Sequence, residues 1–101
     1  MKFKIPKKTR IFSTEIKVVM EDKLEHETGC VGEANYNMGL IKIQNSTKER
    51  PVTKVALEQI YLHELIHWIF NQLNEHDLRK NEKLVDTMSM ALHQALTDAE
   101  Y

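Results

Sequence analysis

The chain has 101 residues, of which 42% are hydrophobic and 29% are charged, and its formal net charge is −1. These values are typical of one soluble globular domain, and we expect a single domain over residues 1–101. A charge this close to zero gives no general attraction to nucleic acid. No apolar run reaches the roughly 20 residues that a membrane-spanning helix needs, so no membrane partner is expected.

The start of the chain is locally basic, with Lys2, Lys4, Lys7, Lys8 and Arg10 among the first ten residues. We interpret this run as a solvated leader or a strand edge rather than a polyanion site. It is not expected to be a signal peptide, because no continuous apolar segment follows the lysines. Cys30 is the single cysteine, which favours a reducing, cytoplasmic setting and a buried or half-buried structural thiol.

The first half of the chain is predicted to form strands. Residues 11–21 are rich in Ile, Val, Phe and Thr, and Ile16, Val18 and Met20 share one face if this segment is extended. Residues 21–29 are polar and predict a loop. Residues 31–36 and 40–44 predict two further strands, joined by a turn at Asn37-Met38-Gly39.

The second half is predicted to form two helices. After a polar connector over 45–50, Pro51 suits the first turn of a helix, and residues 52–73 predict one long helix that is apolar around most of its circumference. A polar break over 74–77 separates it from a second helix over 78–99. The apolar residues of that helix at helical spacing predict a buried stripe of Val85, Met88, Leu92, Ala95 and Ala99.

The long helix contains the pattern His63-Glu64-Leu65-Ile66-His67 within an otherwise apolar stretch. Residues four apart share one face of a helix, so His63 and His67 can present both imidazoles to one ion. Glu64 lies beside them, where it can reach a water on that ion and act as general base. Buried satisfied histidines are the alternative, but a divalent metal would compensate all three polar groups at once.

A catalytic zinc usually takes three protein ligands, so a third should come from another element. Glu82 and Asp86 are four apart on the second helix. Glu82 could complete the site, and Asp86 could accept a hydrogen bond from a ligand histidine. Two alternatives remain: both carboxylates are solvated helix positions, or the third ligand is one of Glu75, His76 and Asp77.

His63-Glu64-x-x-His67 followed by Asn81-Glu82-x-x-x-Asp86 resembles the gluzincin arrangement of zinc metallopeptidases. The order of elements resembles small phage, prophage and archaeal proteins of the minigluzincin and ImmA/IrrE-like type, over residues 10–98. The resemblance implies a zincin-like α+β fold, with a small antiparallel or mixed sheet of about three strands packed on the central helix. It also implies zinc ligands His63, His67 and Glu82, base Glu64, and a supporting carboxylate at Asp86.

The expected function is therefore zinc-dependent hydrolysis of a peptide or protein substrate. The resemblance implies a repressor or another regulatory protein as substrate. The segment 40–44 is the expected strand edge for that substrate, by analogy with zincin-like folds. Tyr36, Tyr61 and His93 are open candidates for an oxyanion donor.

Two other functions stay open at this stage. In one, zinc bound by the same residues only holds the helices of a non-catalytic binding module together. In the other, the chain is a latent enzyme in which residues 94–101 fold over the cleft. The sequence leaves the oligomeric state and the cleavage specificity open.

Overall fold

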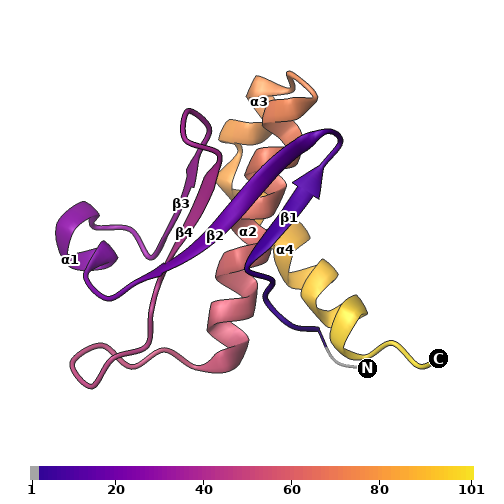
Figure 1. Ribbon diagram of the computed structural model, residues 1–101. Helices are drawn as coiled ribbons and strands as arrows, with labels where there is room; N and C mark the ends of the chain where they lie inside the picture. The colour runs from indigo at the N-terminus through magenta and orange to yellow at the C-terminus, as the bar shows by residue number, and fades with distance from the viewer. Residues whose placement is uncertain (1–2) are drawn as a thin grey trace.

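One four-stranded mixed sheet, in the order β1-β2-β4-β3, organises the computed structural model, which describes residues 3–101 (Figure 1). The middle pair, β2 and β4, is parallel, and both outer pairs are antiparallel. The strands are β1 (Lys8–Ile11), β2 (Thr14–Glu21), β3 (Gly32–Asn35) and β4 (Leu40–Gln44). The general α+β class is therefore confirmed, but the sheet has four described strands where about three were expected.

The additional strand comes from the basic start of the chain. β1 pairs with β2 across a turn at Phe12 and Ser13, and Phe12 adopts a positive φ of 54° there. The basic run is thus a strand edge over Lys8 and Arg10, while Lys2 lies outside the described residues. The expectation of one strand over 11–21 was wrong, because this turn divides that segment. The limits of β4 agree with the prediction.

The segment 21–29 contains the short helix α1 (Leu24–Thr28), so the prediction of a plain loop was wrong. Leu24 anchors the turn with 3% of its surface exposed. The buried side chain of Gln44 binds both ends of this turn. Its amide nitrogen donates to the Asp22 carbonyl at 2.7 Å, and its amide oxygen accepts from the Glu25 backbone N–H at 2.8 Å. Gly29 ends the helix in the left-handed conformation.

The long helix α2 (Lys54–Gln72) lies across one face of the sheet (Figure 1). Thr53 caps its start by accepting a hydrogen bond from Ala56 N. The core between the two layers consists of Ile16, Ile41, Ile43, Tyr61, Leu62 and Trp68. The Trp68 indole also donates to the Leu40 carbonyl at 3.1 Å, which fixes the angle of the helix on β4.

The segment after α2 differs from its prediction. The short helix α3 (His76–Lys80) begins inside the expected break over 74–77 and takes in the first residues of the expected second helix. The last helix, α4, spans Glu82–Thr97 rather than starting at Leu78. Asn81 separates the two helices, because its side chain accepts a hydrogen bond from Leu84 N and caps α4. Glu82 is therefore the first residue of α4. None of the helices in residues 3–101 is long and apolar enough to cross a membrane.

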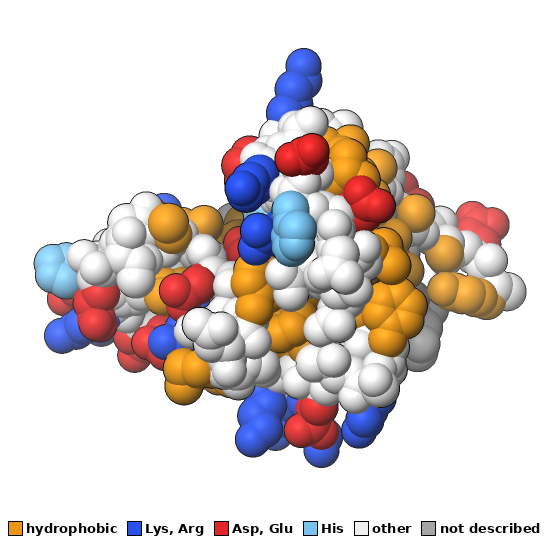
Figure 2. Space-filling model, turned by 90° about the horizontal axis from the view of Figure 1, so that it is seen from above, with side chains coloured by type: hydrophobic (Ala, Val, Ile, Leu, Met, Phe, Trp, Pro, Cys, Tyr) orange, Lys and Arg blue, Asp and Glu red, His pale blue; other side chains and the backbone are white. Residues whose placement is uncertain are grey.

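The stripe predicted for α4 was wrong except at Val85. Met88 is 40% exposed and Leu92 is 38% exposed, Ala95 is also exposed, and Ala99 lies beyond the helix end. The buried positions are Val85, Ser89 and His93, of which the last two are polar. Hydrophobic side chains accordingly reach the surface of the molecule, as the view onto the α3 end shows (Figure 2).

Candidate metal centre

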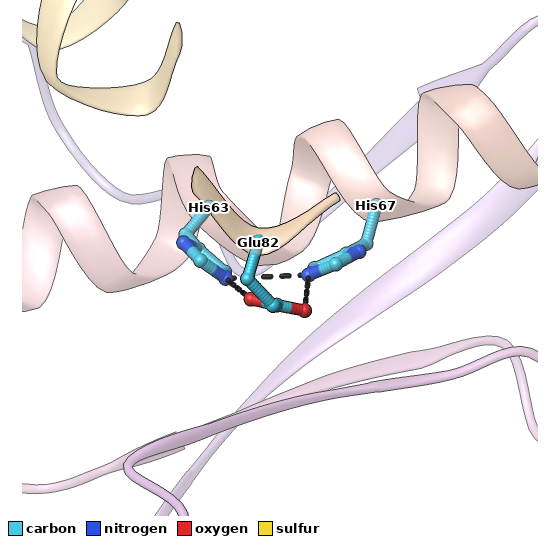
Figure 3. A group of neighbouring side chains, drawn as sticks. All are labelled: His63, His67 and Glu82. Carbon is cyan, nitrogen blue, oxygen red and sulfur yellow. Dashed lines mark hydrogen bonds and ion pairs between the residues drawn. The ribbon is translucent and has the colours of Figure 1, made fainter. Parts of the chain in front are cut away.

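Three side chains converge where the start of α4 passes the middle of α2. His63 and His67 project from successive turns of α2, and the Glu82 carboxylate reaches both from the first turn of α4 (Figure 3). His63 Nε2 lies 3.1 Å from Glu82 Oε2, and His67 Nε2 lies 3.1 Å from Glu82 Oε1. The two Nε2 atoms are 3.2 Å apart. The three residues thus form a compact triangle of nitrogen and oxygen atoms.

The size of this triangle fits a tetrahedral transition metal. Ligand atoms at bonds of about 2.0–2.1 Å from zinc are separated by about 3.3 Å in a regular tetrahedron. The observed separations of 3.1–3.2 Å are close to that edge. Two imidazoles and one carboxylate are also a donor set that binds zinc in proteins. The residues present therefore fit such an ion.

The other sides of the two imidazole rings also face acceptors. His63 Nδ1 lies 3.5 Å from Asp86 Oδ1, one turn along α4 from Glu82. Burial lowers the pKa of His67 and favours its neutral form, while the nearby backbone of Arg79 acts in the opposite direction as an acceptor for the ring. A ring that donates through Nδ1 turns the Nε2 lone pair toward the triangle. The arrangement therefore prepares both Nε2 atoms for a cation.

Glu64 lies next to the triangle but is not part of it. It is 8% exposed, and burial raises the pKa of its carboxyl group to about 7, with His63 acting in the opposite direction. A carboxyl group with a pKa near neutrality can both accept and return a proton. Glu64 thus has the burial and the position expected of a general base.

A cavity of about 520 Å³ opens beside these groups. Residues 30–32 form one wall and the N-terminal half of α2 forms the other, while the triangle, Glu64 and Asp86 close the end. Gly32 makes this wall possible, because a Cβ atom there would lie 2.7 Å from Glu64 Oε2 and 2.8 Å from Ile60 Cγ2. The absence of a side chain lets β3 approach the Glu64 carboxylate closely.

The strand edge next to this cavity belongs to β3. β4 pairs with β2 on one side and with β3 on the other, so the expectation that 40–44 is a free edge was wrong. With a parallel neighbour on one side and an antiparallel neighbour on the other, β4 has no open hydrogen-bonding side. β3 is the outer strand, and Gly32 belongs both to it and to the cavity wall.

The three candidates for an oxyanion donor lie in different surroundings. His93 points away from the site, because its Nε2 atom bonds to buried Glu58 Oε1 at 2.8 Å. Tyr61 is 3% exposed within the core. Tyr36 packs edge-on against Trp68, and the Arg79 guanidinium lies 5.3 Å from its ring centre. The structure thus places His93 and Tyr61 in the interior, and it leaves the role of Tyr36 a prediction.

Three other expectations can be compared with the site. Glu75, His76 and Asp77 are not among the residues that form the triangle. The segment 94–101 contributes no residue to the cavity wall, so it does not cover the cleft as the latent-enzyme hypothesis required. Cys30 is exposed at the cavity wall rather than buried.

Sequence reasoning missed several residues of this site. Ala56, Gln59 and Ile60 line the cavity, and their spacings of seven, four and three residues from His63 place them on its face of α2. That spacing was a usable signal. Arg79 and Gly32 gave none, because their contacts with His67 and Glu64 depend on the tertiary fold.

Comparison with known proteins finds no match among family models, curated proteins or solved structures.

Proposed function

We propose that this protein is a zinc-dependent peptidase with a zincin-like site. The observation that carries the proposal is the triangle of His63, His67 and Glu82, with the buried Glu64 carboxylate and an open cavity beside it. Within residues 3–101, the cluster of possible metal ligands contains three residues. Three protein ligands and an accessible fourth position are typical of catalytic zinc, whereas structural zinc is usually closed by four.

The proposed roles follow from where each group lies. A bound zinc ion would polarise a peptide carbonyl and lower the pKa of water at its open position. Glu64 takes the proton of the attacking water and returns it to the nitrogen of the leaving amine. His63 and His67 act as neutral ligands, and Asp86 keeps the His63 ring in its orientation.

We propose that an extended substrate segment enters along β3. The backbone of Gln44 donates to the Val31 carbonyl at 2.8 Å, so Val31, Glu33 and Asn35 direct their backbone groups toward β4. Gly32 and Ala34 then direct theirs to the free edge. A peptide strand added at that edge would pass the cavity next to Glu64, and main-chain hydrogen bonds would bind it with little dependence on sequence.

The alternative is a binding module in which zinc only joins α2 to α4. This alternative uses the same three ligands, but it gives no reason for a carboxylate at Glu64 to be buried at the wall of an open cavity. An unpaired buried carboxyl group costs stability, so a catalytic role gives a reason for its presence that the binding module lacks. The cavity and Glu64 therefore favour catalysis.

The test uses Glu64→Gln, which keeps the shape of the side chain but cannot accept a proton. Zinc-loaded wild type, Glu64→Gln and the control Glu75→Gln are each incubated with a mixed peptide library, and cleavage is followed by mass spectrometry. We expect cleavage by wild type and the control, and none by Glu64→Gln, with equal zinc content in all three. Cleavage by Glu64→Gln would contradict the base role, and no cleavage by zinc-loaded wild type would favour the binding module.

A further inference from the structure

A second polar contact joins α2 to α4, away from the metal centre. His93 Nε2 of α4 lies 2.8 Å from Glu58 Oε1 of α2, and the two side chains are only 8% and 6% exposed. The Phe3 ring covers His93 edge-on at a centroid distance of 6.4 Å. Burying two ionisable groups is costly, and such a pair is weak evidence for added stability. The proposed peptidase reaction makes no use of it.

The pair and the proposed metal ligand lie on the same side of α4. Eleven residues separate Glu82 from His93, which is close to three full helical turns and about 16 Å along the axis. Glu82 meets His63 and His67 at one end of the helix contact, and His93 meets Glu58 further along. A rotation or shift of α4 that broke the second contact would therefore move Glu82 as well.

The contacts between these two points are mostly apolar. Val85 packs with Ile66 and Phe70, and the buried Ser89 hydroxyl donates to the Asp86 carbonyl of its own helix. Apolar contact is non-directional and tolerates small shifts of one helix on another. A buried hydrogen-bonded pair accepts only one arrangement, and fixing register is the best-attested use of such pairs.

We propose that Glu58 and His93 are positioning residues that fix the register of α4 on α2 and so hold Glu82 at metal-binding distance before an ion binds. The inference rests on the proposed metal site and deepens it. The position of Glu82 depends on the register of α4, because Glu82 is the first residue of that helix and its side chain is 68% exposed. Little packing around Glu82 itself restrains its side chain.

The test separates register from stability with the double variant Glu58→Leu/His93→Leu. Replacing a buried ion pair by apolar residues of similar size is often neutral or stabilising. We therefore expect the metal-free double variant to unfold in urea at the same or a higher concentration than wild type. We also expect its zinc dissociation constant, from chelator competition, to rise about tenfold, a size typical of coupling between two separate sites.

Two further variants control the experiment. His93→Gln can still donate to Glu58 and should keep wild-type affinity. Leu96→Ala removes core packing one turn away and should lower stability without weakening zinc binding by the folded protein. Cobalt(II) absorption gives a second measure, and we expect a weaker band only in the double variant.

Four results would contradict the inference. Wild-type zinc affinity in a folded double variant would show that the pair does not position Glu82. An unfolded double variant would show that the pair maintains the fold rather than the register. Equal loss of affinity in Leu96→Ala would assign the effect to general destabilisation. No zinc binding by wild type would overturn the proposed function as well, whereas the other results leave it intact.

Discussion

The Nε2 atoms of His63 and His67 lie 3.2 Å apart, and each faces one carboxylate oxygen of Glu82 at 3.1 Å. Two nitrogen lone pairs and a carboxylate at this separation repel one another unless positive charge lies between them. Protons or a metal ion can supply that charge, and we propose a metal ion, because burial lowers the pKa of His67 and disfavours its protonated form.

Asp86→Ala should weaken zinc binding without abolishing it. Asp86 lies 3.5 Å from His63 Nδ1 and is not one of the three converging ligands. Loss of such a supporting carboxylate typically lowers metal affinity about 10–100-fold. Competition with a chromophoric chelator measures the change, and Asp98→Ala at the other end of α4 is the matched control. Equal affinity of the two variants would remove Asp86 from the site.

Gly32→Ala should destabilise the fold through Glu64. The added Cβ atom would lie 2.7 Å from Glu64 Oε2 and 2.8 Å from Ile60 Cγ2. Such overpacking typically costs about 1–3 kcal/mol. Urea unfolding of Gly32→Ala, Glu64→Ala and the double variant measures the coupling between the two positions. The cost of Gly32→Ala should be smaller when Glu64 is already truncated, and a cost that is the same in both backgrounds would show no contact between them.

The free energy of unfolding should fall in alkaline solution, partly because of Tyr61. Burial raises the pKa of Tyr61 above its usual value of 10.0. Below pH 10 the neutral phenol contributes fully to stability, and this contribution is lost as the pH rises through the higher pKa of the folded state. The loss per group is at most about 1.4 kcal/mol for each pH unit.

Tyr61→Phe isolates this effect, because phenylalanine has no proton to lose. Urea unfolding of wild type and Tyr61→Phe from pH 8 to 11 should give a stability difference that changes above pH 10 in favour of the variant. Tyr36, whose pKa burial also raises, remains in both proteins and does not affect the difference. A difference that is constant over this range would contradict the buried position of the Tyr61 hydroxyl.

The geometry of the candidate metal centre was largely accessible from the sequence. Spacing of four residues places His63 and His67 on one face of a helix by the geometry of the helix alone. The pair Glu82 and Asp86 follows the same rule, and both residues lie at the positions expected from that spacing. Local rules suffice here because each half of the site lies within one helix.

The packing of α4 was not accessible in this way. Its apolar residues lie on two faces of the helix. Helical periodicity predicted burial of the face with Met88 and Leu92, but both residues are exposed. The true buried face contains Ser89 and His93, which hydrophobicity disfavours. His93 is buried because Glu58, 35 residues away, provides its partner. No local pattern contains that information.

Zinc content tests the central claim most directly. Wild type, His63→Ala, Glu82→Ala and the control Glu75→Ala would be loaded with zinc, desalted and measured by atomic emission, with circular dichroism to verify folding. We predict one zinc ion per chain in wild type and the control, and loss of stoichiometric zinc in His63→Ala and Glu82→Ala. Wild type without zinc, or full zinc content in both ligand variants, would contradict the proposed metal centre.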